Sequence, residues 1–72
     1  MADKKTAQGG ALAGREIIIE FHPIGTYMKV VAMDVKTLTE AATQGPASAG
    51  EKVLEYNALK RLEYVMKKKG LI

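Results

Sequence analysis

The sequence predicts a small α+β domain, in which a three-stranded antiparallel β-meander packs on one C-terminal α-helix in the order β-β-β-α. Two alternating stretches rich in β-branched residues are separated by a turn signal, and a weaker alternating stretch follows a second turn. The last third of the chain instead carries apolar residues at helical spacing. With 72 residues and no cysteine, the chain has room for one core and no disulfide to support it.

The N-terminal residues 1–14 contain three glycines, several alanines and no sustained apolar periodicity. Such a segment buries too little apolar surface to offset the entropy that it would lose on ordering. We therefore expect residues 1–14 to form a disordered tail and residues 15–72 to form a single folded domain. An arm that folds onto a partner is the alternative interpretation of the tail.

Residues 15–22 form the first expected strand, because their apolar residues alternate toward one face. The segment Pro23-Ile24-Gly25 interrupts this strand, and residues 27–33 then resume the alternation. We expect a hairpin whose outer face sets Glu20 opposite Lys29. Its inner pairs are expected to be Ile17 with Ala32, Ile19 with Val30, and Phe21 with Met28.

A second turn is expected at residues 34–37, because Asp34 is a favoured first residue of a turn. It leads into a weaker third strand at residues 39–44, whose Ala41 and Thr43 continue the inner face. These small residues leave room for a helix to approach the sheet. Gly45-Pro46 then ends the strand and directs the chain into the helix.

Residues 48–70 are expected to form one amphipathic helix that carries its own start and stop signals. Ser48 and Glu51 fit a capping box, and Gly70 after a run of three lysines fits the end of a helix. The apolar residues fall within one arc of the helical wheel, which we expect to pack on the sheet: Leu54, Ala58, Leu59, Leu62, Val65 and Met66.

Several segments resemble a family of small bacterial proteins of unknown function, and the resemblance covers nearly everything after Gly14. It is carried by residues 15–22, Lys29-Val30, Ala32-Met33-Asp34, Gly45-Pro46-Ala47 and Leu62-Glu63-Tyr64-Val65. The resemblance implies a cytoplasmic bacterial domain and transfers no activity, catalytic residue or ligand. In that family a glycine commonly ends the second turn, where this chain has Leu38, and the third strand is usually more apolar.

The residue types argue against catalysis and against metal binding. His22 is the only histidine, and no nucleophile or orienting acid accompanies it at a diagnostic spacing. Asp34 and Glu40 lack the spacing of metal ligands and fit turn chemistry and a solvated rim. We therefore expect no catalytic residue, metal, cofactor or small-molecule substrate. No apolar stretch is long enough to span a bilayer, so we expect no membrane insertion and a cytoplasmic location.

The outer face of the sheet is the first surface that this fold leaves open, because one helix covers only one face. A candidate interface on this face mixes apolar and polar side chains, namely Ile18, His22, Tyr27, Val31 and Met33. An ordinary wetted sheet face is one interpretation of this surface. Self-association through the face or through the sheet edge is the other.

The back of the helix is the second open surface. Tyr56, Lys60, Tyr64 and Lys68 recur at every fourth residue and form a continuous row away from the apolar arc. Residues 51–72 hold six Lys or Arg against three acidic residues, so the basic excess of the chain lies on the helix. The row suits contact with a protein or a nucleic acid, or it only shields neighbouring side chains.

From these surfaces we expect a non-catalytic module that binds a protein partner or a second copy of itself. The alternative is a nucleic-acid-binding module that uses the basic and aromatic face of the helix. The element order is similar to the later part of a double-stranded RNA-binding domain, which adds an earlier helix and a basic start to the last helix. Here that start offers Lys52 between Glu51 and Glu55, so we rank protein partners ahead of nucleic acid.

Overall fold

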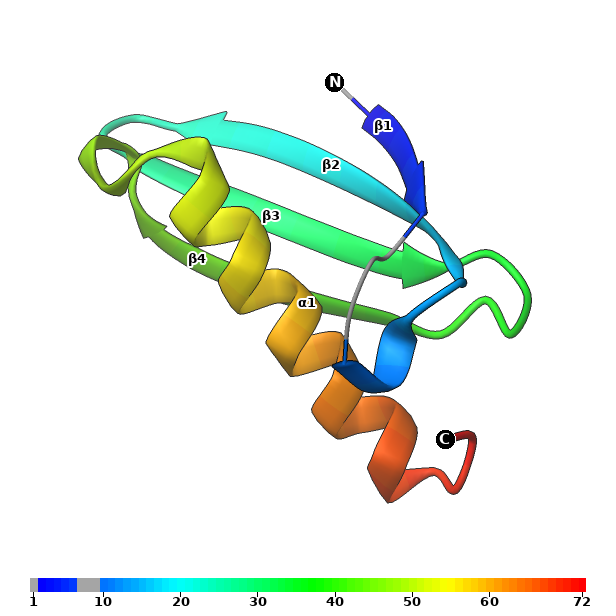
Figure 1. The fold of residues 1–72 in the computed structure, drawn as a ribbon. Coiled ribbons are helices and arrows are strands. Elements are labelled where there is room, and N and C mark those ends of the chain that lie inside the picture. The colour runs from blue at the N-terminus through cyan, green and yellow to red at the C-terminus, as the bar shows by residue number, and fades with distance from the viewer. Residues whose placement is uncertain (1, 7–9) are drawn as a thin grey trace.

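The computed structural model describes residues 2–6 and 10–72. In this part of the chain, four antiparallel strands form one sheet in the order β1-β2-β3-β4, and a helix covers one face of the sheet (Figure 1). The elements in chain order are β1 (Ala2–Thr6), the 3-10 turn η1 (Gly10–Leu12), β2 (Glu16–Ile24), β3 (Tyr27–Asp34), β4 (Glu40–Pro46), the 3-10 turn η2 (Ala47–Ala49) and α1 (Glu51–Lys68). The predicted α+β class is confirmed, with β2, β3 and β4 as the meander and α1 as the C-terminal helix.

The core lies between the inner face of the sheet and the apolar arc of α1, which lies over β3 and β4 (Figure 1). Gly45 allows this close approach, since a Cβ atom there would lie 2.9 Å from Cδ2 of Leu54. The predicted arc is confirmed, because Leu59 and Val65 are partly buried and the other four members are fully buried. The buried core residues are Leu12, Ile17, Ile19, Val30, Ala32, Ala41, Leu54, Ala58, Leu62 and Met66.

The observed register of the first hairpin differs from the predicted register by two residues. Ile19 lies opposite Ala32 and Phe21 opposite Val30, whereas the predicted register paired Ile19 with Val30. The strands continue to a two-residue turn, in which Gly25 adopts a φ of +59° that suits a tight hairpin. A slip of two residues keeps every side chain on its face, so the predicted inner and outer faces still hold.

The N-terminal segment differs from the expected disordered tail over the residues that the structure describes. Ala2–Thr6 forms an edge strand paired with residues 16–20 of β2, and Leu12 is buried in the core. Strand pairing uses backbone groups and needs no pattern of apolar side chains, which explains why composition did not predict this strand. Residues 1 and 7–9 of the predicted tail lie outside the described residues.

The sequence predicted the C-terminal end of α1 correctly and its N-terminal cap wrongly. The capping box is wrong, because Ser48 lies in η2 and the residue before the helix is Gly50, at a φ of +93° and with no side-chain cap. The C-terminal signal is confirmed: the amides of Gly70 and Leu71 donate to the carbonyls of Lys67 and Met66, respectively. This pattern is a Schellman motif with Gly70 in the left-handed conformation.

Leu38 ends the turn between β3 and β4 with a φ of +60°, and it is the non-glycine residue with positive φ among those described. Its side chain is 69% exposed, so little packing holds the residue in this conformation. The left-handed region costs an L-residue about 1–2 kcal/mol and costs glycine almost nothing. The positive φ at this position therefore favours glycine over leucine.

We expect Leu38→Gly to raise the free energy of unfolding by about 0.5–1 kcal/mol, since relief of the strained φ exceeds the entropy that glycine adds to the unfolded chain. Urea unfolding followed by circular dichroism measures the change. Lys36→Gly is the matched control, because its φ is not positive and the same substitution should destabilise there. If Leu38→Gly is no more stable than wild type, the turn does not have this conformation.

Candidate functional site

The exposed face of α1 presents the predicted row of Tyr56, Lys60, Tyr64 and Lys68 to solvent. The two tyrosine side chains are 60% and 52% exposed, respectively, and the two lysines are also exposed. Helical spacing places this row away from the buried arc, so burial of Leu62 and its neighbours fixes the orientation of the tyrosines. The row is therefore open to a partner along its length.

Three basic side chains pack against the tyrosine rings of this row. The Lys60 ammonium lies 5.8 Å from the Tyr56 ring centre, and Arg61 and Lys68 each lie 5.6 Å from the Tyr64 ring centre. These are cation–π distances, and they hold charge beside both rings. Arg61 was not among the predicted site residues, although its three-residue spacing from Tyr64 was the available signal.

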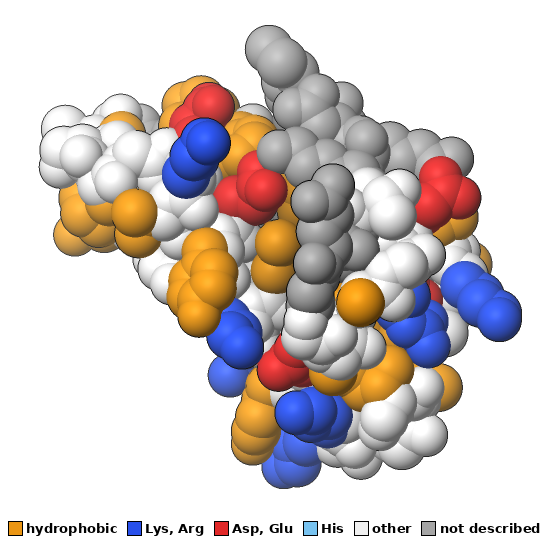
Figure 2. Space-filling model, viewed as in Figure 1, with side chains coloured by type: hydrophobic (Ala, Val, Ile, Leu, Met, Phe, Trp, Pro, Cys, Tyr) orange, Lys and Arg blue, Asp and Glu red, His pale blue; other side chains and the backbone are white. Residues whose placement is uncertain are grey.

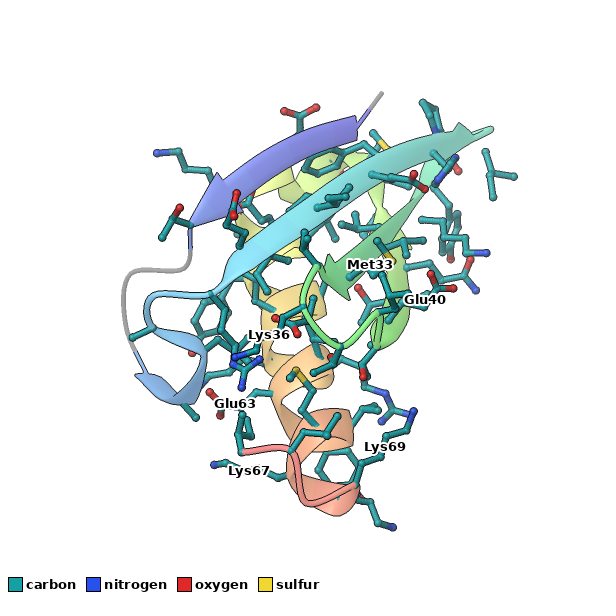
Figure 3. All side chains as sticks on the ribbon, turned by 90° about the vertical axis from the view of Figure 1, so that its right-hand side faces the viewer. Met33, Lys36, Glu40, Glu63, Lys67 and Lys69 are labelled. Atoms are coloured by element: carbon teal, nitrogen blue, oxygen red, sulfur yellow. The ribbon has the colours of Figure 1, made fainter. Side chains whose placement is uncertain are left out.

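Glu63 anchors the edge of the same face and was also missed. Its carboxylate lies 3.7 Å from the Lys60 ammonium and 3.6 Å from that of Lys67, and it accepts a hydrogen bond of 3.3 Å from the Ala11 amide. Figure 3 shows Glu63 and Lys67 on the side of α1 that faces η1. This carboxylate is thus engaged by its own domain and fixes two lysines in place.

The result is a surface that we call the basic tyrosine face. It consists of Tyr56, Lys60, Arg61, Tyr64, Lys67 and Lys68. Figure 2 shows Lys and Arg side chains gathered over the C-terminal half of α1, with hydrophobic side chains beside them. A surface that pairs exposed rings with positive charge suits an acidic macromolecule, because the rings supply contact area and the cations supply charge recognition.

The outer sheet face is the second predicted surface, and the structure brings its residues together on β2 and β3. Ile18 lies opposite Met33, and both side chains are half-buried, as is Val31 on the next row. Tyr27, at the turn end of the sheet, is 54% exposed. A hollow of about 480 Å³ opens at this end, and its lining residues are Ile24, Lys29, Ala42, Thr43 and Gln44.

His22 lies in an exposed position on the outer sheet face, opposite Lys29, which the predicted register had paired with Glu20. Its Nε2 atom lies 3.0 Å from Oε1 of Glu20, two residues earlier on the same strand. Both side chains are open to solvent, so the pair forms an exposed ion pair when the imidazole is protonated. Such pairs contribute little to stability.

Asp34 sits in a polar cluster at the end of β3 and is only 1% exposed. Its Oδ2 atom accepts hydrogen bonds from Arg15 at 3.1 Å, from the Thr37 amide at 2.9 Å and from the Thr37 hydroxyl at 2.8 Å. Burial raises the pKa of Asp34, but the hydrogen bonds from Thr37 and Arg15 and the Arg15 charge outweigh it, so the net pKa is lowered. The cluster joins the start of β2 to the second turn and has a structural role.

Residues 2–6 and 10–72 contain neither a metal-binding cluster nor a membrane-spanning helix. No three His, Cys, Asp or Glu residues of this part of the chain lie close enough together to hold a metal ion. Within the same residues, no helix combines the length and apolar character that crossing a bilayer requires.

The comparisons with known proteins identify a family. The family model described as "Domain of unknown function (DUF6898)" matches residues 14–69, which include β2, β3, β4 and α1. No curated protein and no solved structure matches the chain.

Proposed function

We propose a binding function for this chain, which belongs to the DUF6898 family of domains of unknown function: it is a non-catalytic module whose basic tyrosine face binds an acidic surface of a partner protein. The observation that carries the proposal is the exposure of Tyr56 and Tyr64 with cations fixed beside both rings. Tyrosine loses little conformational entropy when it is covered, so exposed tyrosines on a rigid helix suit a protein interface.

The charge of the face specifies the chemistry of the partner. Glu63 is paired with Lys60 and Lys67, which leaves Arg61 and Lys68 beside Tyr64 to meet acidic groups. Complementary charge speeds association and selects among partners, whereas the tyrosine area supplies most of the affinity. A partner with carboxylates around an apolar contact therefore fits this face best.

A nucleic acid fits the same face less well. Bases bind such surfaces by stacking on aromatic rings, while lysines neutralise phosphates. The Tyr64 ring already has two cations within 5.6 Å of its centre, and a stacking base would have to displace at least one of them. This geometry favours an acidic protein over single-stranded nucleic acid.

We expect the double change Tyr56→Ser, Tyr64→Ser to abolish most partner binding while each substitution shifts stability by only about 0.5 kcal/mol, because both side chains are exposed. The measurement is an NMR titration of the full chain with a synthetic acidic peptide that contains aromatic residues. Affinity purification from the native cell, with wild type and variant as baits, then identifies the natural partner. Tyr27→Ser is the matched control, because Tyr27 is equally exposed but lies on the outer sheet face.

Three outcomes would contradict the proposal. Unfolding of the double variant would place the tyrosines in the core, and unchanged binding by the folded variant would place the functional surface elsewhere. Tighter binding of single-stranded DNA than of the peptide, with a steep salt dependence and loss in the same variant, would favour the nucleic-acid alternative.

A further inference from the structure

We propose that the acidic partner contributes an extended segment, which pairs with the open edge of β4 and adds an antiparallel strand to the sheet. This inference rests on the proposed function, and it gives the partner segment a conformation and a pattern of side chains. In strand addition, main-chain hydrogen bonds supply affinity and alternate side chains supply specificity. Such binding requires an open sheet edge beside a surface that recognises those side chains.

β4 is one edge of the sheet, and every second residue of it points its backbone groups away from β3 (Figure 1). The Asp34 amide donates to the Thr39 carbonyl, and at the other end of this pairing the Ala47 amide donates to the Thr26 carbonyl. Because hydrogen bonds between antiparallel strands involve alternate residues, the odd-numbered residues of β4 are the ones bonded to β3. The amides and carbonyls that face the open edge therefore belong to Glu40, Ala42 and Gln44.

This edge is unprotected in the part of the chain that the structure describes. No described strand lies beyond β4, and the side chains of Glu40, Ala42 and Gln44 are exposed. Proteins commonly protect an open edge with lysine, proline or a bulge. β4 contains no lysine, pairs with β3 without a bulge and has its proline at the last position, Pro46. The outward amides and carbonyls are thus available to a second polypeptide, which a nucleic acid cannot replace in this pairing.

The side of α1 that adjoins this edge is basic. α1 lies over β3 and β4, and its other side is partly buried at Leu59 and reaches η1 through the bond between Glu63 and the Ala11 amide. Helical spacing places Arg61 and Lys68 away from Glu63, on the side toward the β4 edge, and both are exposed. The acidic residues of α1 fall elsewhere on the helical wheel. Positive charge therefore lies beside the open backbone groups.

These two features specify the pattern of the partner segment. In a strand added to β4, alternate side chains point to the face that carries α1 and to the outer sheet face. Acidic side chains on the α1 face meet Arg61 and Lys68. The side chains between them lie beside Ala42 and the hollow that it lines with Ile24, where apolar groups fit. A segment in which acidic and apolar residues alternate is therefore the occupant.

N-methylated peptides test the backbone pairing without any change to the protein. The probe is a short peptide of alternating glutamate and valine, titrated into the full chain and followed by NMR. Opposed residues of an antiparallel pair share a face and a hydrogen-bonding direction, so the valines, on the face of Glu40, Ala42 and Gln44, direct their amides at β4.

We expect N-methylation of the valines to raise the dissociation constant by about 100-fold, because it removes the donors to β4. N-methylation of the glutamates is the matched control, since their amides point away from β4, and it should change the constant less than about threefold. Equal binding of the two methylated peptides, or tighter binding of the one methylated at valine, overturns the proposal. So does the absence of binding by the unmethylated peptide at millimolar concentration.

Ala42→Pro tests the edge from the side of the protein. Proline removes the outward amide of residue 42 and breaks no hydrogen bond to β3, so the sheet should form and the peptide should bind at least about tenfold more weakly. Ala42→Thr keeps the amide and should bind like wild type. Circular dichroism checks folding, and if Ala42→Pro does not fold, the methylated peptides decide alone. A folded Ala42→Pro that binds like wild type overturns the proposal.

Charge reversal tests the recognition of the acidic side chains. Arg61→Glu should weaken binding of the peptide by about tenfold. Lys52→Glu is the matched control, because Lys52 is exposed on the same side of α1 as Glu63, and it should bind like wild type. Equal binding by Arg61→Glu and wild type overturns the alternating acidic pattern.

The variant Tyr56→Ser, Tyr64→Ser separates this inference from the proposed function. Loss of peptide binding in that variant, with no effect of valine methylation in wild type, leaves the proposed function standing and overturns strand addition. Unchanged binding in that variant, with a strong effect of valine methylation, supports strand addition and contradicts the proposed role of the tyrosines.

Discussion

Leu62→Ala should lower the free energy of unfolding by about 2–5 kcal/mol, a large share of what a domain of this size possesses. Leu62 is fully buried at the middle of the apolar arc, so truncation leaves a cavity between α1 and the sheet. The surrounding strands cannot close that cavity without moving, because they are paired in a register that fixes their positions.

Denaturant unfolding at neutral pH measures this loss, with Leu71→Ala as the control. Leu71 takes part in the C-terminal Schellman motif through its backbone amide, and its side chain is 39% exposed, so the same substitution there should cost less than about 1 kcal/mol. A near-neutral Leu62→Ala would mean that α1 packs through a different face.

Asp34→Ala should be the second most damaging change and should cost about 2–3 kcal/mol at neutral pH. Asp34 is buried, and it holds the Thr37 amide, the Thr37 hydroxyl and the Arg15 guanidinium in one cluster. Its removal leaves these donors without their acceptor and releases the second turn from the start of β2. Thermal and urea unfolding measure the loss, and Glu40→Ala, at an exposed carboxylate nearby, should have little effect.

The Asp34 contribution should also depend on pH. Because the pKa of Asp34 is lower in the folded state than in the unfolded state, its stabilisation is fully present above the unfolded-state pKa. It is lost as the pH falls through the window between that value and the lower folded-state pKa. The difference in unfolding free energy between wild type and Asp34→Ala should therefore shrink on acidification. A difference that does not change with pH would show that the charge of Asp34 is not what stabilises the turn.

The sequence predicted the faces of the elements better than it predicted their pairing. Leu54, Ala58 and Leu62 repeat with the period of a helix, and burial of that arc is a local consequence of their spacing. In a strand the faces repeat every two residues, so the apolar pattern cannot distinguish the predicted register from one shifted by two. The turn at Gly25 decides between them, and its backbone conformation is not visible in the pattern.

The same limit applies to the candidate site. Tyr56 and Tyr64 could be placed from the four-residue spacing alone, because their exposure follows from the orientation of one helix. The role of Glu63 could not be placed, since it depends on the Ala11 amide, which is distant in the chain and reaches the helix only through η1. Such a contact joins two segments that are distant in the sequence, so no local periodicity of the sequence can predict it.

The position of α1 over β3 and β4 has a consequence for how the chain folds. Only η2 separates β4 from α1, so β3, β4 and α1 form one continuous segment that makes these contacts without the N-terminal strands. Every strand also pairs with its neighbour along the chain. Short loops cost little entropy to close, and proteins rich in such contacts fold fast. The topology thus favours a nucleus built from β3, β4 and α1, to which β2 and finally the edge strand β1 are added.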